Sequence, residues 1–126
     1  MDFKSNETIY SQIIEYIKKQ IFSGSYASGA RLPAIRDLAL KCRVNPNTIV
    51  RVYAHLAEEG LIYTDSTNGK FVTTDEEHIL QKKREYLESK AAAFAREMRE
   101  AGLKSEEVTT MLQDIMQGGE DEKYRS

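Results

Sequence analysis

The chain has 126 residues, 40% hydrophobic and 30% charged, with a formal net charge of −2 at pH 7. This length fits one domain, or a small domain with an appendage. No apolar run is long enough to cross a bilayer, and residues 1–4 lack the apolar segment of a secretory signal. The single cysteine, Cys42, excludes an internal disulfide framework. We therefore expect a cytoplasmic protein with no membrane partner.

The charge is distributed unevenly along the chain. Residues 31–51 contain five Lys/Arg and one Asp, a local net charge of +4. Residues 76–126 contain nine Lys/Arg and twelve Asp/Glu, a local net charge of −3. A basic patch combined with an acidic remainder is typical of a protein that binds DNA with one face.

The first two predicted helices lie between residues 8 and 42. Isoleucines recur every four residues from Ile9 to Ile21, which predicts an amphipathic helix that begins at Thr8 and ends before Ser23-Gly24. A loop of small residues follows, in which Leu32 is expected to form a short extended bridge. Pro33 is then predicted to open a second helix that continues to about Cys42.

The stretch from Asn45 to Gly60 carries the signals for both ends of a third helix. Asn45 is a good N-cap, Pro46 suits the first helical position, and Gly60 suits the left-handed residue after the end. Its apolar residues at helical spacing are Ile49, Val52, Tyr53 and Leu56. Two helices joined by a tight turn at residues 43–44 form a helix-turn-helix.

The opposite face of this third helix carries Asn47, Arg51, Ala54 and Glu58. Asn and Arg make paired hydrogen bonds to base edges, and the small Ala54 allows a close approach to a groove floor. We interpret the helix as a DNA recognition helix. The alternative is a surface helix with an ordinary polar face.

A β-hairpin is predicted directly after the third helix. Residues 61–64 and 70–73 are rich in aromatic and β-branched residues, and the Asn68-Gly69 pair between them readily adopts positive φ. Such a hairpin is the wing of a winged helix-turn-helix. Lys70, placed at its tip, is a candidate for contact with phosphates or the minor groove. An alternative interpretation of equal weight is that Lys70 is a solvated lysine of the hairpin.

Two further helices are predicted in the remainder. Residues 74–77 match a Thr-x-x-Glu capping box, which predicts a long helix to about Ala101. Ser105 is expected to cap a shorter helix that ends at Gly118-Gly119. Apolar residues at heptad spacing in the first helix, and one apolar face in the second, indicate a hairpin that needs a partner surface. The residues expected to form the dimer contact are Leu80, Leu87, Phe94, Met98, Leu112 and Ile115.

These patterns predict a mainly α fold with a small β-hairpin. The expected organisation is a winged helix-turn-helix at residues 8–74, a helical dimerisation hairpin at residues 75–118 and a disordered acidic tail at residues 119–126. His55 and His78 lack Cys or His at metal-ligand spacing and are expected to face solvent or phosphate. Cys42 is better explained as a core residue than as a redox sensor. We expect no catalysis, no metal and no cofactor.

The chain resembles the GntR family of bacterial transcription regulators, and within it the YtrA-like subfamily, over residues 9–73. The motifs that carry the resemblance include Ile9-Tyr10-Ser11-Gln12-Ile13, Gly29-Ala30-Arg31-Leu32-Pro33-Ala34-Ile35-Arg36, Val44-Asn45-Pro46-Asn47-Thr48-Ile49 and Gly69-Lys70-Phe71-Val72. The resemblance implies that Arg36 and the start of the recognition helix contact DNA. Pro46 and Val50 stand where many family members place base-contacting arginines, which leaves Arg51 as the only long basic side chain on this helix.

The expected function is that of a transcriptional regulator, a repressor, which binds a palindromic operator in double-stranded DNA as a homodimer. The expected DNA-binding residues are Arg31, Arg36, Asn45, Asn47, Thr48, Arg51, Asn68, Gly69 and Lys70. No sequence feature points to a small-molecule effector, although the class allows one. The alternative from another class is a winged helix that serves as a protein-interaction module.

Overall fold

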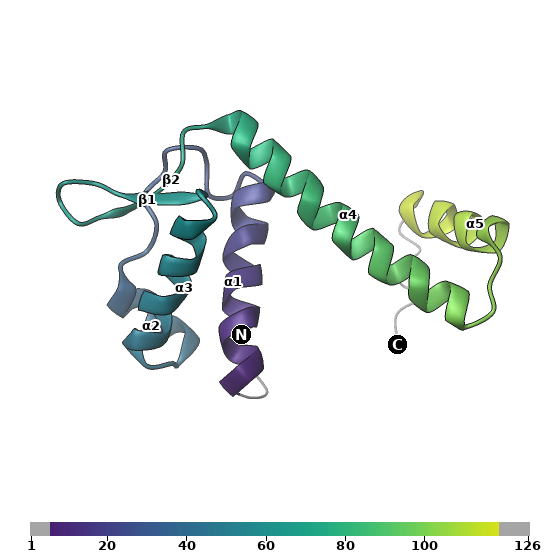
Figure 1. Cartoon of the computed structure of the whole chain (residues 1–126), viewed down its shortest axis with the longest axis horizontal. Coiled ribbons are helices and arrows are strands. Elements are labelled where there is room, and N and C mark those ends of the chain that lie inside the picture. The colour runs from purple at the N-terminus through teal and green to yellow at the C-terminus, as the bar shows by residue number, and fades with distance from the viewer. Residues whose placement is uncertain (1–5, 119–126) are drawn as a thin grey trace. The chain divides into compact units, whose positions relative to one another are not determined.

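The computed structural model describes residues 6–118, and their side chains from residue 9 onward. The elements are α1 (Asn6–Phe22), α2 (Ile35–Cys42), α3 (Pro46–Glu58), β1 (Ile62–Thr64), β2 (Lys70–Val72), α4 (Glu76–Glu100) and α5 (Ser105–Met116), as Figure 1 shows. The predicted mainly α fold with one hairpin is confirmed. The chain divides into two compact units between Arg84 and Glu85, within α4. The predicted tail at residues 119–126 lies outside the described residues.

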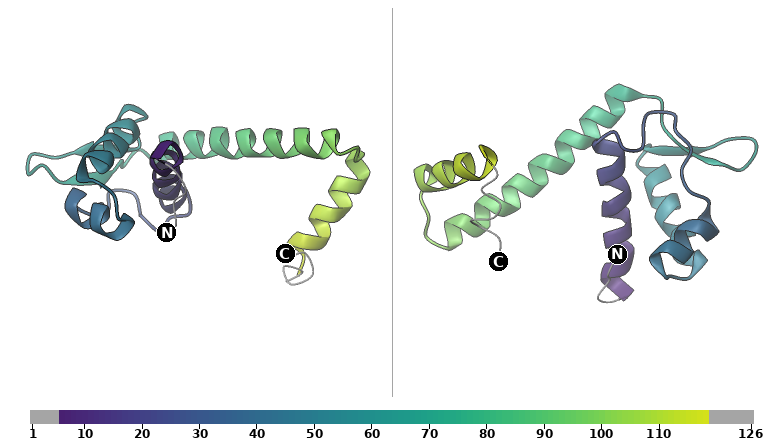
Figure 2. Two further views of the ribbon diagram at one scale, coloured as in Figure 1. Left: turned by 90° about the horizontal axis from the view of Figure 1, so that it is seen from below. Right: turned by 180° about the vertical axis from the view of Figure 1, so that it is seen from behind.

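The first unit is built around α3, which packs against both α1 and α2 (Figures 1 and 2). The core combines apolar residues from these three helices with the inner side of the hairpin. Its fully buried large side chains are Tyr53, Ile13, Ile17, Leu38, Ile49, Leu56, Leu61, Val52 and Val72. The hydroxyl of buried Tyr53 donates a hydrogen bond to the carbonyl of Pro33 at 2.7 Å. This bond attaches α3 to the segment that leads into α2.

The turn between α2 and α3 forms as the sequence predicts. Arg43 ends α2 in the left-handed conformation, with φ of 59°, and its backbone N–H bonds to the carbonyl of Leu40 at 3.2 Å. Asn45 then caps α3, because its side-chain oxygen accepts a hydrogen bond from the backbone N–H of Asn47 at 2.8 Å. Pro46 is the first helical residue, so the predicted helix-turn-helix is confirmed.

The hairpin is antiparallel, with Ile62 opposite Val72 and Thr64 opposite Lys70. The loop before α2 adds a third extended segment at its edge, where Arg31 forms a bridge with Phe71. The N–H of Leu32 donates to the carbonyl of Lys70 at 2.8 Å. The β-bridge expected at Leu32 is therefore present, but the residue that forms it is Arg31.

The predicted start of the second helix is wrong by two residues. Ala34 is extended, with φ of −62° and ψ of 151°, and α2 begins at Ile35. A residue that precedes a helix as its N-cap has non-helical backbone angles, and the Pro33 carbonyl is held by Tyr53 in the core. The first helix, by contrast, begins before the predicted Thr8, at Asn6.

The predicted caps of the last two helices are also wrong by one residue each. Asp75, not Thr74, caps α4, because its carboxylate accepts from the backbone N–H of His78 at 3.1 Å. Ser105 is the first residue of α5 and Lys104 precedes it. There the carboxylate of Glu107 accepts from the backbone N–H of Lys104 at 2.9 Å.

The second unit contains the later part of α4, a turn at Gly102 with φ of 89°, and α5. Neither α4 nor α5 contains a buried residue. Leu87 is 50% exposed, Leu112 39% and Met116 82%. Across residues 6–118, none of the helices combines the length and the apolar character that a membrane span requires.

Candidate nucleic-acid interface

The N-terminal end of α3 presents polar groups and no acidic side chain. The oxygen of Asn45 is used in the cap, whereas Asn47 is exposed and Thr48 is half-buried. The first backbone N–H groups of a helix lack intrahelical partners, and the helix dipole favours negative charge at this end. This end of α3 is therefore suited to a DNA phosphate and to base edges beside it.

Arg51 lies on the side of α3 that faces α1. Its guanidinium carbon is 4.5 Å from the centroid of the Tyr10 ring, and the residue remains exposed. The Tyr10 ring also forms a T-shaped pair with the His55 ring, with centroids 6.3 Å apart. Tyr10 is not among the expected DNA-binding residues, because its position in the Ile9–Ile13 motif beside the apolar row of α1 does not reveal a contact with a residue of α3. A cation held over a ring loses less side-chain freedom when it binds a base or phosphate.

Another side of α3 faces the hairpin across a hollow of about 150 Å³. The residues that line it are Ile35, Val50, Tyr53, Ala54, Ala57, Ile62, Thr64 and Lys70. Lys70 is not at the tip of the hairpin, where the sequence placed it, but opens β2. Its ammonium donates to the hydroxyl of Thr64 at 2.8 Å. The lysine is thus fixed on the hairpin beside the recognition helix.

The tip of the wing is organised by Asp65. Its carboxylate accepts three hydrogen bonds, from the Thr67 hydroxyl at 2.6 Å, the Thr67 backbone N–H at 2.9 Å and the Gly69 backbone N–H at 3.1 Å. These bonds, led by that from the Thr67 hydroxyl, hold the pKa of Asp65 below its usual value. Within residues 65–69 the structure therefore has a preformed loop.

The predicted positive φ occurs at Asn68, with φ of 68°, and not at Gly69. Gly69 is needed for space instead. A Cβ there would lie 3.0 Å from the Phe71 ring and 3.3 Å from the guanidinium of Arg31. Arg31 itself is exposed, with its guanidinium carbon 5.8 Å from the centroid of the Phe71 ring. A side chain at residue 69 would therefore have to displace the Phe71 ring or the Arg31 guanidinium.

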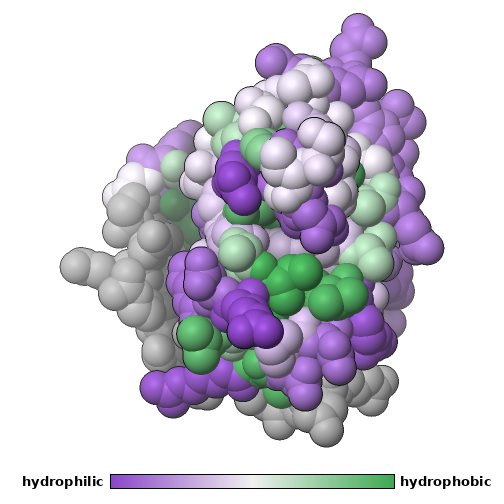
Figure 3. Space-filling view, turned by 90° about the vertical axis from the view of Figure 1, so that its left-hand side faces the viewer, coloured by the Kyte–Doolittle hydropathy of each residue, from purple (hydrophilic) through white to green (hydrophobic). Residues whose placement is uncertain are grey.

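Arg36 is exposed on α2, beside an apolar hollow that includes Leu40 and Pro46. The face toward which the hairpin and α2 point carries a small apolar area among hydrophilic side chains (Figure 3). Leu40 is 78% exposed and Val50 is 47% exposed. Apolar groups beside a major groove contact the methyl group of thymine. The interface thus combines cations, amides and apolar side chains.

The cations of this surface are available to phosphates. Among the ion pairs of the part of the chain that the structure describes, none involves Arg31, Arg36 or Arg51. The expected site residues lie in three groups: Arg36 with the start of α3, Arg51 beside α1, and Arg31, Asn68 and Lys70 on the wing.

Three other residues singled out in the sequence have structural positions. His78, expected to face solvent or phosphate, instead places its Nε2 2.7 Å from the backbone carbonyl of Glu59. His55 is half-buried with its Nε2 3.6 Å from the Glu59 carboxylate. Cys42 is buried in the core, and burial raises the pKa of its thiol, the opposite of what a reactive thiolate needs. Between residues 6 and 118, no three His, Cys, Asp or Glu side chains form a group that could hold a metal.

Three packed helices, with a capped recognition helix and a two-stranded wing after it, define a winged helix-turn-helix domain of the DNA-binding class. The model of the family described as "Bacterial regulatory proteins, gntR family" matches residues 9–72. The chain belongs to this family of transcriptional regulators and is not an enzyme.

Relatives support this assignment over most of the chain. The uncharacterized HTH-type transcriptional regulator YhcF of Bacillus subtilis (strain 168) is 30% identical over 117 residues, which cover 93% of this chain and 97% of YhcF. The HTH-type transcriptional repressor YtrA of the same organism is 36% identical over 73 residues, or 58% of this chain and 56% of YtrA. The predicted resemblance to the GntR family and to YtrA is confirmed.

Solved structures agree with the fold. A GntR family transcriptional regulator from Listeria monocytogenes has a TM-score of 0.83 and 36% identity, covering 89% of this chain and 98% of that chain. The structure of AraR(DBD) in complex with operator ORR3 has a TM-score of 0.50 and 28% identity, covering 52% of this chain and 78% of that chain. The second of these structures holds a domain of this type on an operator.

Proposed function

We propose that this regulator is a cytoplasmic repressor that binds a palindromic operator as a homodimer. Residues 8–74 read the DNA and residues 75–118 join the two subunits. The repressor role is supported by the similarity to the repressor YtrA. The operator contacts are supported by the exposed polar and cationic groups around α3 and the wing.

The main support for the proposed dimer is the exposed apolar row on α4 and α5. Leu80 is 63% exposed and Leu87 is 50% exposed, although both stand at heptad positions of a continuous helix. A short helical hairpin without buried residues gains little stability from its own contacts. Such an exposed row is most commonly buried against a second copy of the same chain. A closed twofold dimer buries the row of both subunits equally.

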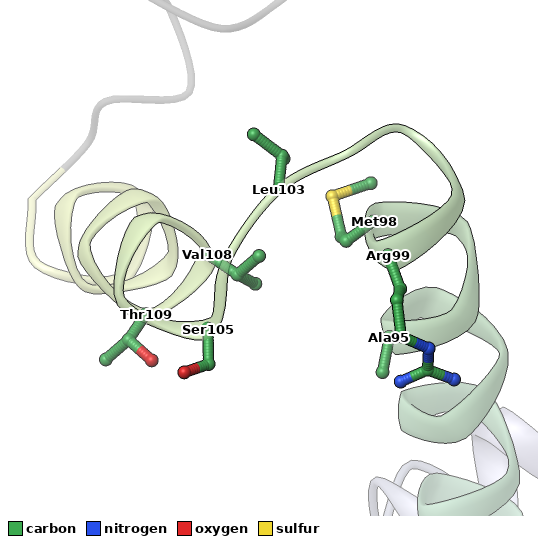
Figure 4. A pocket seen from close by; sticks show the side chains of 7 residues that line it. All are labelled: Ala95, Met98, Arg99, Leu103, Ser105, Val108 and Thr109. Atoms are coloured by element: carbon green, nitrogen blue, oxygen red, sulfur yellow. The ribbon is translucent and has the colours of Figure 1, made fainter.

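The hollow between α4 and α5 fits this arrangement. It has a volume of about 260 Å³ and is shown in Figure 4 with its lining residues Ala95, Met98, Arg99, Leu103, Ser105, Val108 and Thr109. Met98 of α4, Leu103 of the turn and Val108 of α5 supply the apolar side chains of this lining. Binding sites for drug-sized ligands have volumes of roughly 300–1,000 Å³. A smaller, largely apolar hollow is better suited to a side chain of the partner subunit.

Selection of bound fragments from random DNA tests the proposal. A twofold dimer presents two recognition helices, so the selected fragments should contain an inverted repeat whose half-sites are about 10 bp apart or a multiple of that. If each subunit neutralises roughly four phosphates, log K should fall with log salt at a slope of about −7. Selection of a single unrepeated motif would contradict the dimer, and a slope shallower than about −2 would contradict DNA as the main partner.

A further inference from the structure

His78, in the first turn of α4, bonds to the end of the recognition helix. The last carbonyls of a helix lack partners within the helix. At the end of α3, the carbonyl of Glu59 lies 2.7 Å from the Nε2 of His78, which fits a donated N–H. The imidazole fills the space beside Gly60, where an added Cβ would lie 2.8 Å from the same nitrogen.

A closed series of hydrogen bonds holds His78 in this position. The Thr73 N–H donates to the carbonyl of Leu61 at 2.9 Å, and the Thr73 hydroxyl accepts from the Asp75 N–H at 3.1 Å. The Asp75 carboxylate accepts from the N–H of His78 at 3.1 Å. The imidazole of His78 then returns to Glu59, two residues before Leu61. Residues 73–78 are thereby attached to the residues that end α3.

Glu59, the C-cap residue that follows α3, is also attached to α1. The ammonium of Lys18 lies 2.9 and 3.1 Å from the two carboxylate oxygens of Glu59. The backbone of Glu59 thus binds α4 while its side chain binds α1. The first turn of α4 therefore cannot rotate relative to the end of α3 without breaking the hydrogen bond between His78 and Glu59.

We infer that His78 is a positioning residue for operator binding: it fixes the start of α4 on the recognition helix and so restricts which half-site spacing the dimer accepts. This inference rests on the proposed dimer, because α4 continues without a break from His78 into the row of Leu80 and Leu87. His78 contacts no DNA in this account. Its loss should leave recognition of one half-site unchanged and relax the spacing.

The test compares full-length His78→Ala, His78→Gln and His78→Asn with the unsubstituted protein. The Gln amide nitrogen reaches about as far as Nε2, whereas the shorter Asn amide does not. Each protein is titrated with a single half-site and with operators whose half-sites are moved apart or together by one and two base pairs. Thermal unfolding and sedimentation establish that each variant is folded and dimeric.

The expected result is that Ala and Asn bind one half-site as the unsubstituted protein does, but their preference for the best spacing falls roughly 2- to 30-fold. Gln restores the preference. Unchanged spacing preference in the Ala and Asn variants overturns the inference, as does an equal loss on one half-site, which would make His78 a stability residue of the winged domain. An unsubstituted protein that is monomeric overturns the proposed dimer itself, which is a separate outcome.

Discussion

The guanidinium of Arg51 lies over the ring of Tyr10, 4.5 Å from its centroid. The only long basic side chain of the recognition helix is therefore held by α1, an element that is not part of the helix-turn-helix pair. A cation–π contact at an exposed site contributes about 0.5–1 kcal/mol. That is enough to favour one orientation of the arginine before DNA arrives.

Replacing Arg51 with Ala should cost roughly 1–3 kcal/mol of operator binding and relax the preference at one base position. Tyr10→Leu serves as the matched variant, because it keeps the arginine and removes the ring. It should weaken binding by less than Arg51→Ala and leave the base preference in place. Titrations against operators substituted one base pair at a time measure both effects. An Arg51→Ala protein with unaltered base preference would mean that the recognition surface lies elsewhere.

Lys70→Ala should weaken binding to all DNA sequences about equally and make the salt slope shallower by about one. The reason is that Lys70, held beside α3 by Thr64, is placed to neutralise a phosphate and not to read a base. Lys104→Ala, which removes an exposed lysine next to α5, is the control and should change neither quantity. A sequence-dependent loss for Lys70→Ala would argue for a base contact.

The wing tip should loosen at acid pH. The pKa of Asp65 is lowered in the folded protein, so its hydrogen bonds stabilise the tip above the unfolded pKa of about 3.9 and are lost as the pH falls through the folded value. The protection factor of the Gly69 amide, whose N–H donates to Asp65, should fall as the pH is lowered through this range. Asp65→Asn, which removes the titration, should show no such fall. The same acid response in both proteins would assign it to another group.

A comparison of Gly60 with Gly24 measures how much folding stability is lost when a side chain is added. Both have positive φ, 75° and 86°, but only Gly60 has a neighbour, His78, within contact distance. Gly24→Ala should cost about 1–2 kcal/mol from backbone strain alone, and Gly60→Ala should cost more. Denaturant unfolding at one protein concentration measures both. When His78 is also replaced by Ala, the losses of stability caused by Gly24→Ala and Gly60→Ala should become equal. A difference that persists in that protein would mean that the extra cost at Gly60 does not come from the imidazole of His78.

The sequence predicts best where the signals are local. Asn45 and Gly60 lie next to the backbone groups that they satisfy, and Pro46 has no N–H that would need a partner, so the bounds of the recognition helix could be read directly. The sequence alone could not decide whether Thr74 or Asp75 caps α4, since both residues are able to cap a helix. The choice is decided by Thr73 and His78, whose contacts with residues 59–61 come from elsewhere in the chain.

Contacts between distant residues explain the other differences. Tyr10 meets Arg51, and Tyr53 holds the carbonyl of Pro33, although neither pair shares a helix or a repeat. At Gly69 the sequence pattern indicated a φ requirement, whereas the reason is the approach of Phe71 and Arg31. Such contacts depend on how the helices pack, which periodicity alone does not specify.

In the proposed dimer, the apolar row of α4 joins two subunits and thereby two half-sites. The most direct test is sedimentation and operator titration of the double variant Leu87→Glu with Phe94→Glu. Ser89→Glu with Ala92→Glu is the control, because both residues are exposed and lie outside the row.

The Leu87/Phe94 variant should be a folded monomer, since burying charges without partners costs several kcal/mol. Its operator affinity should fall by roughly 10²–10⁴, because the second half-site is no longer linked to the first. The control should remain dimeric with full affinity. A Leu87/Phe94 variant that stays dimeric, or that becomes monomeric and still binds the operator undiminished, would show that this row does not join the two subunits.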